Sequence, residues 1–447
     1  MQKTFIQLLW FVTRRYLTRF NPRIIGVTGS VGKTSVCEAI SLAVQTKYTV
    51  RHPKKNYNTP IGLPLAVLGE NSPGRSPMAW AGLFYRAFTA QSAPQFIVLE
   101  YGADAPGDIL ALTKLVTPEI AVITAISPVH LVNYPSLNHL IEEKATLGDK
   151  VPATGLVILN NDDRFLALMK NRFTAPILTY GFKSAAIQGK VQELKVDQPL
   201  SHQPTITTNF AITVNRSVDT TPSDSISSDS TPPQSPLSLP LQIHLTDTVS
   251  NALPSAALAA EAVAVHLNLN LLSVAAALGN LKPLPGRGTI IAGIKNSLII
   301  DDSYNAAPAS MAAGLIGLGK FKTLLPDRRR LAVIGKMAEL GDRSDAEHAE
   351  IGKLAFEVAD ILIFVGELTR TAMHAALSAG ANTASVEWFS SPVEAARFLD
   401  RYIKFGDIIY VKGSQSARME KVVYQIMAQP LQATKLLVRQ EAKWLAD

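Results

Sequence analysis

The stretch that decides the fold is GVTGSVGKTSV, residues 26–36. An apolar run leads into a glycine-bearing turn, after which Lys33 and Thr34 begin a helical pattern. Such glycines let backbone N–H groups approach phosphate oxygens, the lysine adds positive charge, and the threonine hydroxyl can reach Mg²⁺. The general pattern G-x-x-x-x-G-K-[ST] is not fully met, because Val27 stands at its first glycine position. We predict ATP binding here; a glycine turn with a solvated lysine is the alternative. The predicted ATP-binding residues of this loop are Gly29, Ser30, Val31, Gly32, Lys33, Thr34 and Ser35.

The composition describes an ordinary globular protein. The chain has 447 residues, of which 47% are hydrophobic and 18% charged, so two or three domains are expected. The one cysteine, Cys37, excludes an intramolecular disulfide and a multi-cysteine zinc site, which suits a reducing cytoplasm. A formal net charge of +7 favours anionic partners such as nucleotides, acidic substrates or lipid headgroups, with a solvated basic surface as the alternative.

Residues 1–21 form a basic, aromatic segment ahead of the phosphate loop. Its run FIQLLWFVTRRYLTRF has no small-residue cleavage site after it, so we do not expect a signal peptide. It also lacks the run of roughly 20 consecutive apolar residues that a helix needs to span a bilayer. Two alternatives stay open: an interfacial membrane helix, and a helix packed on the protein itself. The predicted apolar stripe consists of Phe5, Leu8, Leu9, Val12, Tyr16 and Phe20.

The chain after this segment predicts an α/β protein. Apolar runs at 23–29, 96–102, 120–126 and 156–162 predict buried strands that end in Gly, Ser, Asn or Asp. Helical patterns lie between these runs. This arrangement is typical of a doubly wound, mostly parallel sheet whose functional groups gather at the carboxyl ends of its strands.

The second half changes character before returning to the same pattern. TITTNFAITVN and LSLPLQIHLTD predict antiparallel strands, separated by a Ser-, Thr-, Asp- and Pro-rich excursion at about 216–238 that we expect to be mobile. SNALPSAALAAEAVAVHL predicts a helix and LKPLPGRG a hinge. The runs SLIIDDS, RLAVIGK, ILIFVGE and DIIYVKGS then predict a second α/β unit. We therefore expect a central P-loop ATPase domain at 22–283 and a C-terminal Rossmann-like domain at 284–447.

A metal site is predicted beside the phosphate loop. Glu100 ends an otherwise apolar strand, and a buried glutamate needs a cation or hydrogen-bonding partners. His130 follows the next predicted strand, so the two side chains would lie at the same edge of the sheet. A capping or core histidine is the alternative for His130.

Taken together, these segments resemble the Mur ligases. The segments that carry the resemblance are TGSVGKT, KNYNTPIGLPL, LEYGADAPGDI, AISPVHL, EEKATL, LNNDD, LPGRG, IDDSYNAAPASM, GKMAELGD and VKGSQSARMEKV. They occur in the family's order and cover residues 22 to about 424. The DDSYNAAP and KGS elements are most similar to the MurF branch, which joins D-alanyl-D-alanine to UDP-N-acetylmuramoyl-tripeptide.

The resemblance implies an ATP- and Mg²⁺-dependent ligase that activates a carboxylate as an acyl phosphate and forms an amide, ADP and phosphate. It implies that Lys33 and Thr34 serve the phosphates and one Mg²⁺, and that Glu100 and His130 are metal ligands. Lys144 matches a lysine that is carbamylated in the family and would then also bind metal; a salt-bridged lysine is the alternative. The implied catalytic residues are Lys33, His130, Lys144 and Arg287.

Further roles follow from the resemblance for residues on both domains. Asn251 matches an asparagine that reads adenine, while Arg287 and Asp302 match residues that reach the nucleotide from the C-terminal domain, so catalysis would need domain closure. The implied contacts to the muramoyl-peptide are Asn56, Asn58 and Thr59. The implied contacts to D-alanyl-D-alanine are Tyr304, Asn305, Lys412, Gly413 and Ser414. Turn or capping roles are the alternative for these residues.

The chain also departs from the family pattern. MurF ligases hold the uridine nucleotide in an N-terminal domain, whereas about twenty residues precede the ATPase domain here. We expect a helper protein for UDP binding, a grip on the sugar-peptide alone, or an acceptor without UDP. A membrane-bound N-terminal segment acting on a lipid-linked precursor is one such hypothesis. Smaller departures are LTDTVSN at the adenine-reading segment, Lys336 and Ala307.

Other functions remain open. A ligase of the folylpolyglutamate type is the enzymatic alternative, and a non-catalytic ATP-binding scaffold is the alternative from a different class. A zinc-ribbon, amidating relative is disfavoured by the single cysteine. No nucleic-acid partner is expected. We predict a cytoplasmic enzyme, with the inner face of the membrane as a further possibility for its location.

Overall fold

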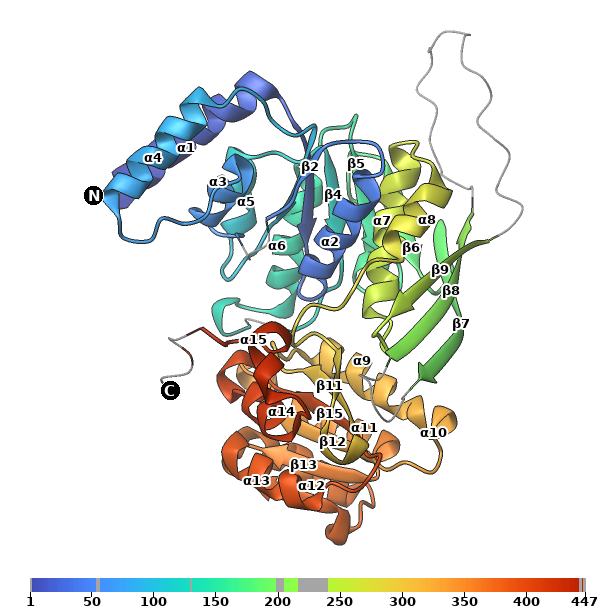
Figure 1. Ribbon diagram of the computed structural model, residues 1–447. Coiled ribbons are helices and arrows are strands. Elements are labelled where there is room, and N and C mark those ends of the chain that lie inside the picture. The colour runs from blue at the N-terminus through green and yellow to red at the C-terminus, as the bar shows by residue number, and fades with distance from the viewer. Residues whose placement is uncertain are drawn as a thin grey trace.

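The computed structural model describes residues 2–53, 57–128, 131–197, 205–215, 240–441 and 444, and places them in two stacked α/β bodies (Figure 1). The predicted excursion at 216–238 and two predicted site residues, Asn56 and His130, lie outside the described residues. Among the described helices, none combines the length and apolar character needed to cross a membrane.

The first body is built on a nine-stranded sheet in the order β2-β3-β1-β4-β5-β6-β7-β8-β9. Strands β2 to β7 run parallel in this order, and β8 and β9 continue the sheet in antiparallel pairs. The strands are β1 (Arg23–Thr28), β2 (Val50–Arg51), β3 (Phe96–Glu100), β4 (Ile120–Ile123), β5 (Leu156–Asn160), β6 (Ile177–Gly181), β7 (Ile187–Asp197), β8 (Thr205–Val214) and β9 (Leu241–Thr246).

Helices cover both faces of this sheet, because alternate residues of each buried strand point to opposite sides. In β1, Ile25 and Val27 pack under α2 (Lys33–Val44), α7 (Ala252–His266) and α8 (Leu271–Leu278). Ile24 belongs to the opposite core. The helices of that side are α1 (Gln2–Phe20), α3 (Gly62–Leu68), α5 (Asp108–Leu115) and α6 (Leu137–Asp149).

The N-terminal helix α1 packs on the protein itself. Leu9, Val12 and Tyr16 are buried in the core that α1 shares with α3 and the sheet, and Phe5 lies 4.6 Å from the ring of Trp80 in α4 (Pro77–Thr89). The predicted stripe therefore belongs largely to the protein core. Other apolar side chains on α1 and α4 remain exposed; these are Leu8, Phe11, Met78, Tyr85 and Phe88.

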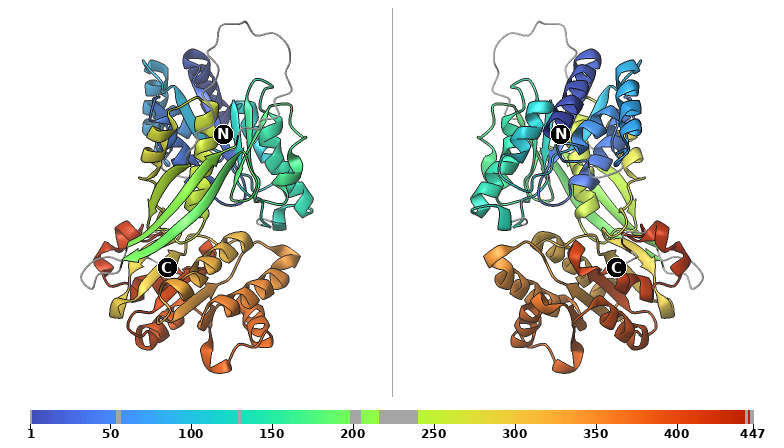
Figure 2. Two further views of the ribbon diagram at one scale, coloured as in Figure 1. Left: turned by 90° about the vertical axis from the view of Figure 1, so that its right-hand side faces the viewer. Right: turned by 90° about the vertical axis from the view of Figure 1, so that its left-hand side faces the viewer.

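The second body is a six-stranded sheet in the order β10-β11-β15-β12-β13-β14, parallel except for the β10–β11 pair. Its strands are β10 (Thr289–Ala292), β11 (Leu298–Asp302), β12 (Arg330–Gly335), β13 (Ile361–Val365), β14 (Val386–Phe389) and β15 (Ile408–Lys412). Its helices are α9 (Pro308–Gly319), α10 (Phe321–Leu324), α11 (Ser344–Val358), α12 (Arg370–Ser378), α13 (Pro392–Tyr402), α14 (Glu420–Ile426) and α15 (Ala433–Leu436). They lie on both faces of the sheet (Figure 2).

The predicted fold class is confirmed: a mostly parallel P-loop sheet is followed by a second, Rossmann-like α/β sheet. The carboxyl ends of β1 and β3 bring Thr28 and Glu100 to one edge of the first sheet. In the second sheet, Asp302 pairs in register with Lys412 at the ends of β11 and β15. Both edges border the space in which the candidate site lies.

Candidate active site

A cavity of about 1280 Å³ lies between the two bodies and is lined by residues of both. The phosphate loop, Glu100 and the start of α7 contribute from the first body. Arg287, Asp302 and the loops after β11 and β15 contribute from the second. The predicted site residues that line it are Ser30, Val31, Gly32, Lys33, Thr34, Ser35, Asn58, Glu100, Asn251, Arg287, Asp302, Tyr304, Asn305, Lys412 and Ser414.

The phosphate loop is shaped by two glycines and by Thr124 at the end of the neighbouring strand. Gly29 has a φ of +142°, and a Cβ on it would lie 2.1 Å from the Thr124 hydroxyl oxygen. Gly32, with a φ of +86°, begins α2 in the left-handed region. Thr124 donates its hydroxyl to the Val31 carbonyl oxygen at 2.5 Å. Side chains at either glycine would strain or fill the loop.

Val27 does not disturb this loop, although the general motif has glycine there. Val27 is fully buried in β1, where it pairs with Glu100 on one side and Val122 on the other. The chain leaves the sheet only after Thr28, so the positions that require glycine begin at Gly29. The loop thus leads directly into a helix start, whose first backbone N–H groups suit a phosphate.

Lys33 lies inside this loop and folds back over it. Its Nζ donates to the carbonyl oxygens of Gly29 at 2.8 Å and Ser30 at 3.5 Å. Burial lowers its pKa, and Arg287 adds to that effect, while Glu100 opposes it. A cation held this close to the loop amides is suited to neutralising phosphate charge.

Thr34 contacts both the Glu100 carboxylate and the Arg287 guanidinium, which face each other across the cavity. Its hydroxyl donates to Glu100 Oε2 at 3.1 Å and accepts from the Arg287 guanidinium at 3.4 Å. Glu100 is only 6% exposed. This oxygen pair fits a divalent cation bound through one carboxylate and a hydroxyl with water and phosphate oxygens, the usual form of a Mg²⁺ site. The described residues contain no cluster of three His, Cys, Asp or Glu side chains that could hold a metal on its own.

Lys144 lies in α6, near enough to Lys33 for the two charges to interact, although it does not line the cavity. It is 2% exposed and donates to the Ala103 carbonyl oxygen at 3.3 Å. Burial, reinforced by the nearby charge of Lys33, lowers its pKa to about 7. A large fraction of this amine is therefore neutral near pH 7, which is the state that can react with CO₂.

The second body contributes a buried ion pair at the cavity wall. Asp302 accepts from Lys412 Nζ at 2.7 Å and from the Tyr410 hydroxyl at 3.1 Å. Lys412 is 2% exposed and also donates to the Asn305 carbonyl oxygen at 2.9 Å. Burial raises the pKa of Asp302, and Lys412 opposes the rise. Lys412 thereby fixes the loop after β11.

The remaining predicted residues have mixed surroundings. Asn251 stands at the start of α7, and its side-chain oxygen accepts from Lys320 at 3.4 Å. Thr59 Oγ1 accepts from the backbone N–H of Gly62 at 3.0 Å, which is a turn role, and Thr59 does not line the cavity. Gly413 also lies outside the lining; a Cβ on it would meet Met419 at 2.6 Å.

The cavity is also lined, at the end of β5, by Asn160, Asp162 and Asp163, for which the sequence predicts no role. Asn160 donates to the Thr124 carbonyl oxygen at 2.8 Å, and Asp163 accepts from the backbone N–H of Ile126 at 2.7 Å. They tie the β5 end to the β4 end. The signal that could have found them is the polar run LNNDD directly after a buried strand.

The fold and the cavity define a P-loop nucleotide-binding protein whose second α/β body closes the site. Residues 27–217 match the Mur ligase middle domain, and residues 286–415 match the Mur ligase, glutamate ligase domain. The chain belongs to the Mur ligase family.

Relatives and solved structures agree with this assignment. The chain is 28% identical over 410 residues to the UDP-N-acetylmuramoyl-tripeptide--D-alanyl-D-alanine ligase of Mycobacterium leprae, covering 88% of this chain and 71% of that protein. It is 28% identical to the enzyme of the same name from Escherichia coli, covering 90% and 76%. The fold is similar to that of the MurF ligase from Thermotoga maritima in complex with ADP, with a TM-score of 0.71, 21% identity, and coverage of 94% and 83%.

Proposed function

We propose that this protein is an ATP-dependent, ADP-forming ligase that joins D-alanyl-D-alanine to a muramoyl-tripeptide. The observation that carries the proposal is the meeting of Lys33, Thr34 and Glu100 with Arg287 across one cavity. The names of the relatives supply the substrates, and the cavity supplies the groups that their reaction needs.

The reaction requires two anions, a carboxylate and the terminal phosphate of ATP, to approach each other. Lys33 lies within the phosphate loop and Arg287 reaches the same loop from the second body, so positive charge surrounds the point of transfer. Bound Mg²⁺ would supply further charge neutralisation and a fixed geometry for the phosphates. Thr34, Glu100 and, once carbamylated, Lys144 are the residues that we assign to hold it, and His130 is assigned as a further ligand.

The second body would contribute water exclusion and the amine substrate. Tyr304, Asn305 and Ser414 line its side of the cavity, opposite the phosphate loop. We assign them to the amine substrate, together with Lys412, which also lines the cavity, and Gly413, which lies between Lys412 and Ser414 in the chain. Asp302 and Asn251 are assigned to ATP, and Asn58 to the muramoyl-peptide, together with Asn56 and Thr59.

A second question is whether the muramoyl-peptide acceptor is attached to UDP or to a lipid. Helices α1 and α4 expose Leu8, Phe11 and Tyr85 on one side of the first body, and Arg14 and Arg15 are exposed on α1. Apolar side chains beside cations suit contact with an anionic membrane. We propose a cytoplasmic location with peripheral contact to the inner face, and either a lipid-linked acceptor or a helper that binds UDP.

The test is phosphate release from Mg-ATP with the UDP-linked and the lipid-linked muramoyl-tripeptide, each with and without D-alanyl-D-alanine. Mass spectrometry identifies the product, and Glu100→Gln is the matched inactive variant. Dipeptide-dependent release with a pentapeptide product is the expected result. If phosphate release depended on glutamate instead, the protein would be a ligase of the folylpolyglutamate type. ATP binding without any acceptor-dependent release would make it a scaffold.

A further inference from the structure

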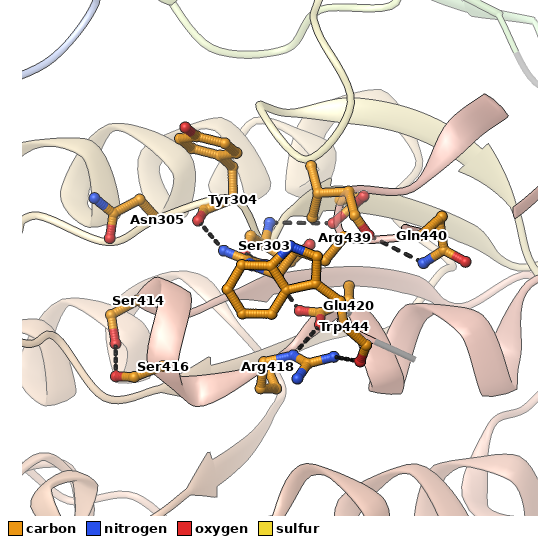
Figure 3. Close-up of polar contacts among 12 residues, drawn as sticks. Ser303, Tyr304, Asn305, Ser414, Ser416, Arg418, Glu420, Arg439, Gln440 and Trp444 are labelled. Atoms are coloured by element: carbon orange, nitrogen blue, oxygen red, sulfur yellow. Dashed lines mark hydrogen bonds and ion pairs between the residues drawn. The ribbon is translucent and has the colours of Figure 1, made fainter. Parts of the chain in front are cut away.

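The C-terminal segment returns to the cavity after the second sheet is complete. Arg439, Gln440 and Trp444 follow α15 and lie near Ser303 and Tyr304 of the loop after β11 (Figure 3). This segment lies beyond residue 415, where the match to the C-terminal family domain ends. Trp444 lines the cavity itself.

Arg439 forms the centre of this contact. Its guanidinium donates to the Ser303 carbonyl oxygen at 3.1 Å, to the Tyr304 carbonyl oxygen, and to Glu420 Oε2 at 2.9 Å. The side chains of Arg439 and Glu420 are 6% and 3% exposed. One buried, charge-neutralised fork thus holds two successive carbonyl groups of the loop.

The backbone of Arg439 adopts an uncommon conformation. Its φ of +58° lies in the left-handed region, which is costly for a residue with a Cβ. Arg418 completes the network: it donates to Glu420 Oε1 at 2.5 Å and to the Trp444 carbonyl oxygen at 2.7 Å. The segment is therefore fixed to α14 at the same carboxylate that neutralises Arg439.

Tyr304 links this network to the phosphate side of the cavity. The Arg287 guanidinium carbon lies 4.2 Å from the centre of the Tyr304 ring, and Arg287 donates to the Thr34 hydroxyl at 3.4 Å. The turn that carries Arg287 also touches the segment, because a Cβ on Gly286 would lie 2.9 Å from Val438 Cγ1. The Tyr304 N–H donates to the Gly286 carbonyl oxygen at 2.9 Å.

We propose that Arg439 is a positioning residue, and that the C-terminal segment locks the Ser303–Tyr304 loop so that Tyr304 holds Arg287 toward the phosphate loop. Arg439 does not line the cavity, whereas Tyr304 does, so Arg439 would act through Tyr304. The kinetic consequence rests on the proposed ligase function, whereas the structural consequence does not.

The experiment compares Arg439→Met and Arg439→Lys with a matched control, Arg330→Met. Arg330 forms a similar ion pair with Asp360 at 2.6 Å in the same body and does not line the cavity. The first readout is amide hydrogen exchange of the full chain, in peptides covering residues 300–306. Arg439→Met should raise exchange there by at least about tenfold, because two carbonyl contacts are lost, while Arg330→Met leaves it unchanged.

The second readout is steady-state ligase kinetics. Arg439→Met should lower kcat by about 10- to 100-fold with little change in the KM for ATP, since Arg287 loses its orientation and the phosphate loop does not. Arg439→Lys should fall between, because a lysine offers charge without the fork. Equal exchange and equal kcat in the Arg439 and Arg330 variants would overturn the proposal. A wild-type chain without ligase activity would refute the proposed function, and hydrogen exchange would still decide the role of Arg439.

Discussion

Glu261 gives the sharpest quantitative prediction for this chain. It lies in the middle of α7, is 0% exposed, and neither carboxylate oxygen has a hydrogen-bond partner among the described residues. Burial raises its pKa from an ordinary value of 4.5 to about 8. The perturbation is Glu261→Gln, which keeps the shape of the side chain and removes its titration.

The sign and size follow from proton linkage. Because the folded-state pKa lies above the unfolded value, proton binding stabilises the fold fully below pH 4.5, and this contribution is lost as the pH rises to about 8. One pKa unit corresponds to about 1.4 kcal/mol. Between pH 6 and pH 9 the wild-type chain should therefore lose about 3 kcal/mol of unfolding free energy through this one group.

The assay is urea unfolding at pH 6 and pH 9, followed by circular dichroism. The pH-dependent loss should be about 3 kcal/mol smaller in Glu261→Gln than in the wild-type chain. Glu350→Gln is the control, because the Glu350 side chain is 69% exposed and its removal should leave the pH dependence intact. Parallel pH profiles for the wild-type chain and Glu261→Gln would refute the reasoning, since they would mean that Glu261 is ionised in the folded state.

Three further predictions concern the cavity. Lys33→Ala should lower acceptor-dependent ADP formation by about 100-fold or more with an unchanged melting temperature, because a cation at the transferring phosphate is lost; a smaller loss would place Lys33 outside the reaction. Lys144→Arg should abolish activity. Wild-type activity should rise with added bicarbonate, and with pH through about 7, where the neutral Lys144 amine becomes abundant. Activity that does not depend on bicarbonate would contradict carbamylation. Lys412→Met should cost about 3–5 kcal/mol in urea unfolding, since the largely buried Asp302 carboxylate loses its cationic partner, and Asp302→Asn in the same chain should recover much of that loss.

The strands that carry the site were predictable because each is short, apolar and followed by glycine or a polar residue. Strands β1, β3, β4 and β5 are buried almost throughout, so composition alone marks them. The half-exposed strands carry no such signal. In β7 buried residues alternate with exposed ones only at its start, and no residue of β14 is fully buried. β2 has two residues.

The N-terminal helix shows a different limit. Its helical periodicity was evident, but periodicity cannot say what an apolar stripe packs against. The partner of Phe5 is Trp80 in α4, which the chain reaches only after β1, α2 and α3. The choice between membrane and protein therefore depended on tertiary structure: Leu9, Val12 and Tyr16 are buried in the protein, and Leu8 and Phe11 are exposed.

The residues of the candidate site also differ in how well the sequence predicts them. Glu100, Asp302 and Lys412 are the last residues of their strands, and Lys33 begins the helix that follows β1 and its glycine loop. A parallel sheet must gather residues in these positions. Arg439 has no such position, since VRQEAKW follows no strand and contains no motif. Its contacts with Glu420 and the Ser303 carbonyl oxygen arise only in the tertiary structure.

The contacts between the two bodies indicate how the site opens. At the cavity, Arg287 reaches Thr34 at 3.4 Å, and the Ala309 N–H reaches the Ser127 hydroxyl at 3.4 Å, both long for hydrogen bonds. Lys320 of the second body donates to the Val249 carbonyl oxygen of the first at 2.9 Å. The connection between the bodies contains Gly286 and Gly288 at φ values of +68° and +80°, and a Cβ on Gly288 would meet nothing. The long contacts at the cavity, beside a glycine connection, favour rotation of one body against the other on that side. Because Arg439 and Lys412 fix the Tyr304 loop within the second body, such a rotation would carry Arg287 and Asp302 toward the phosphate loop as one unit.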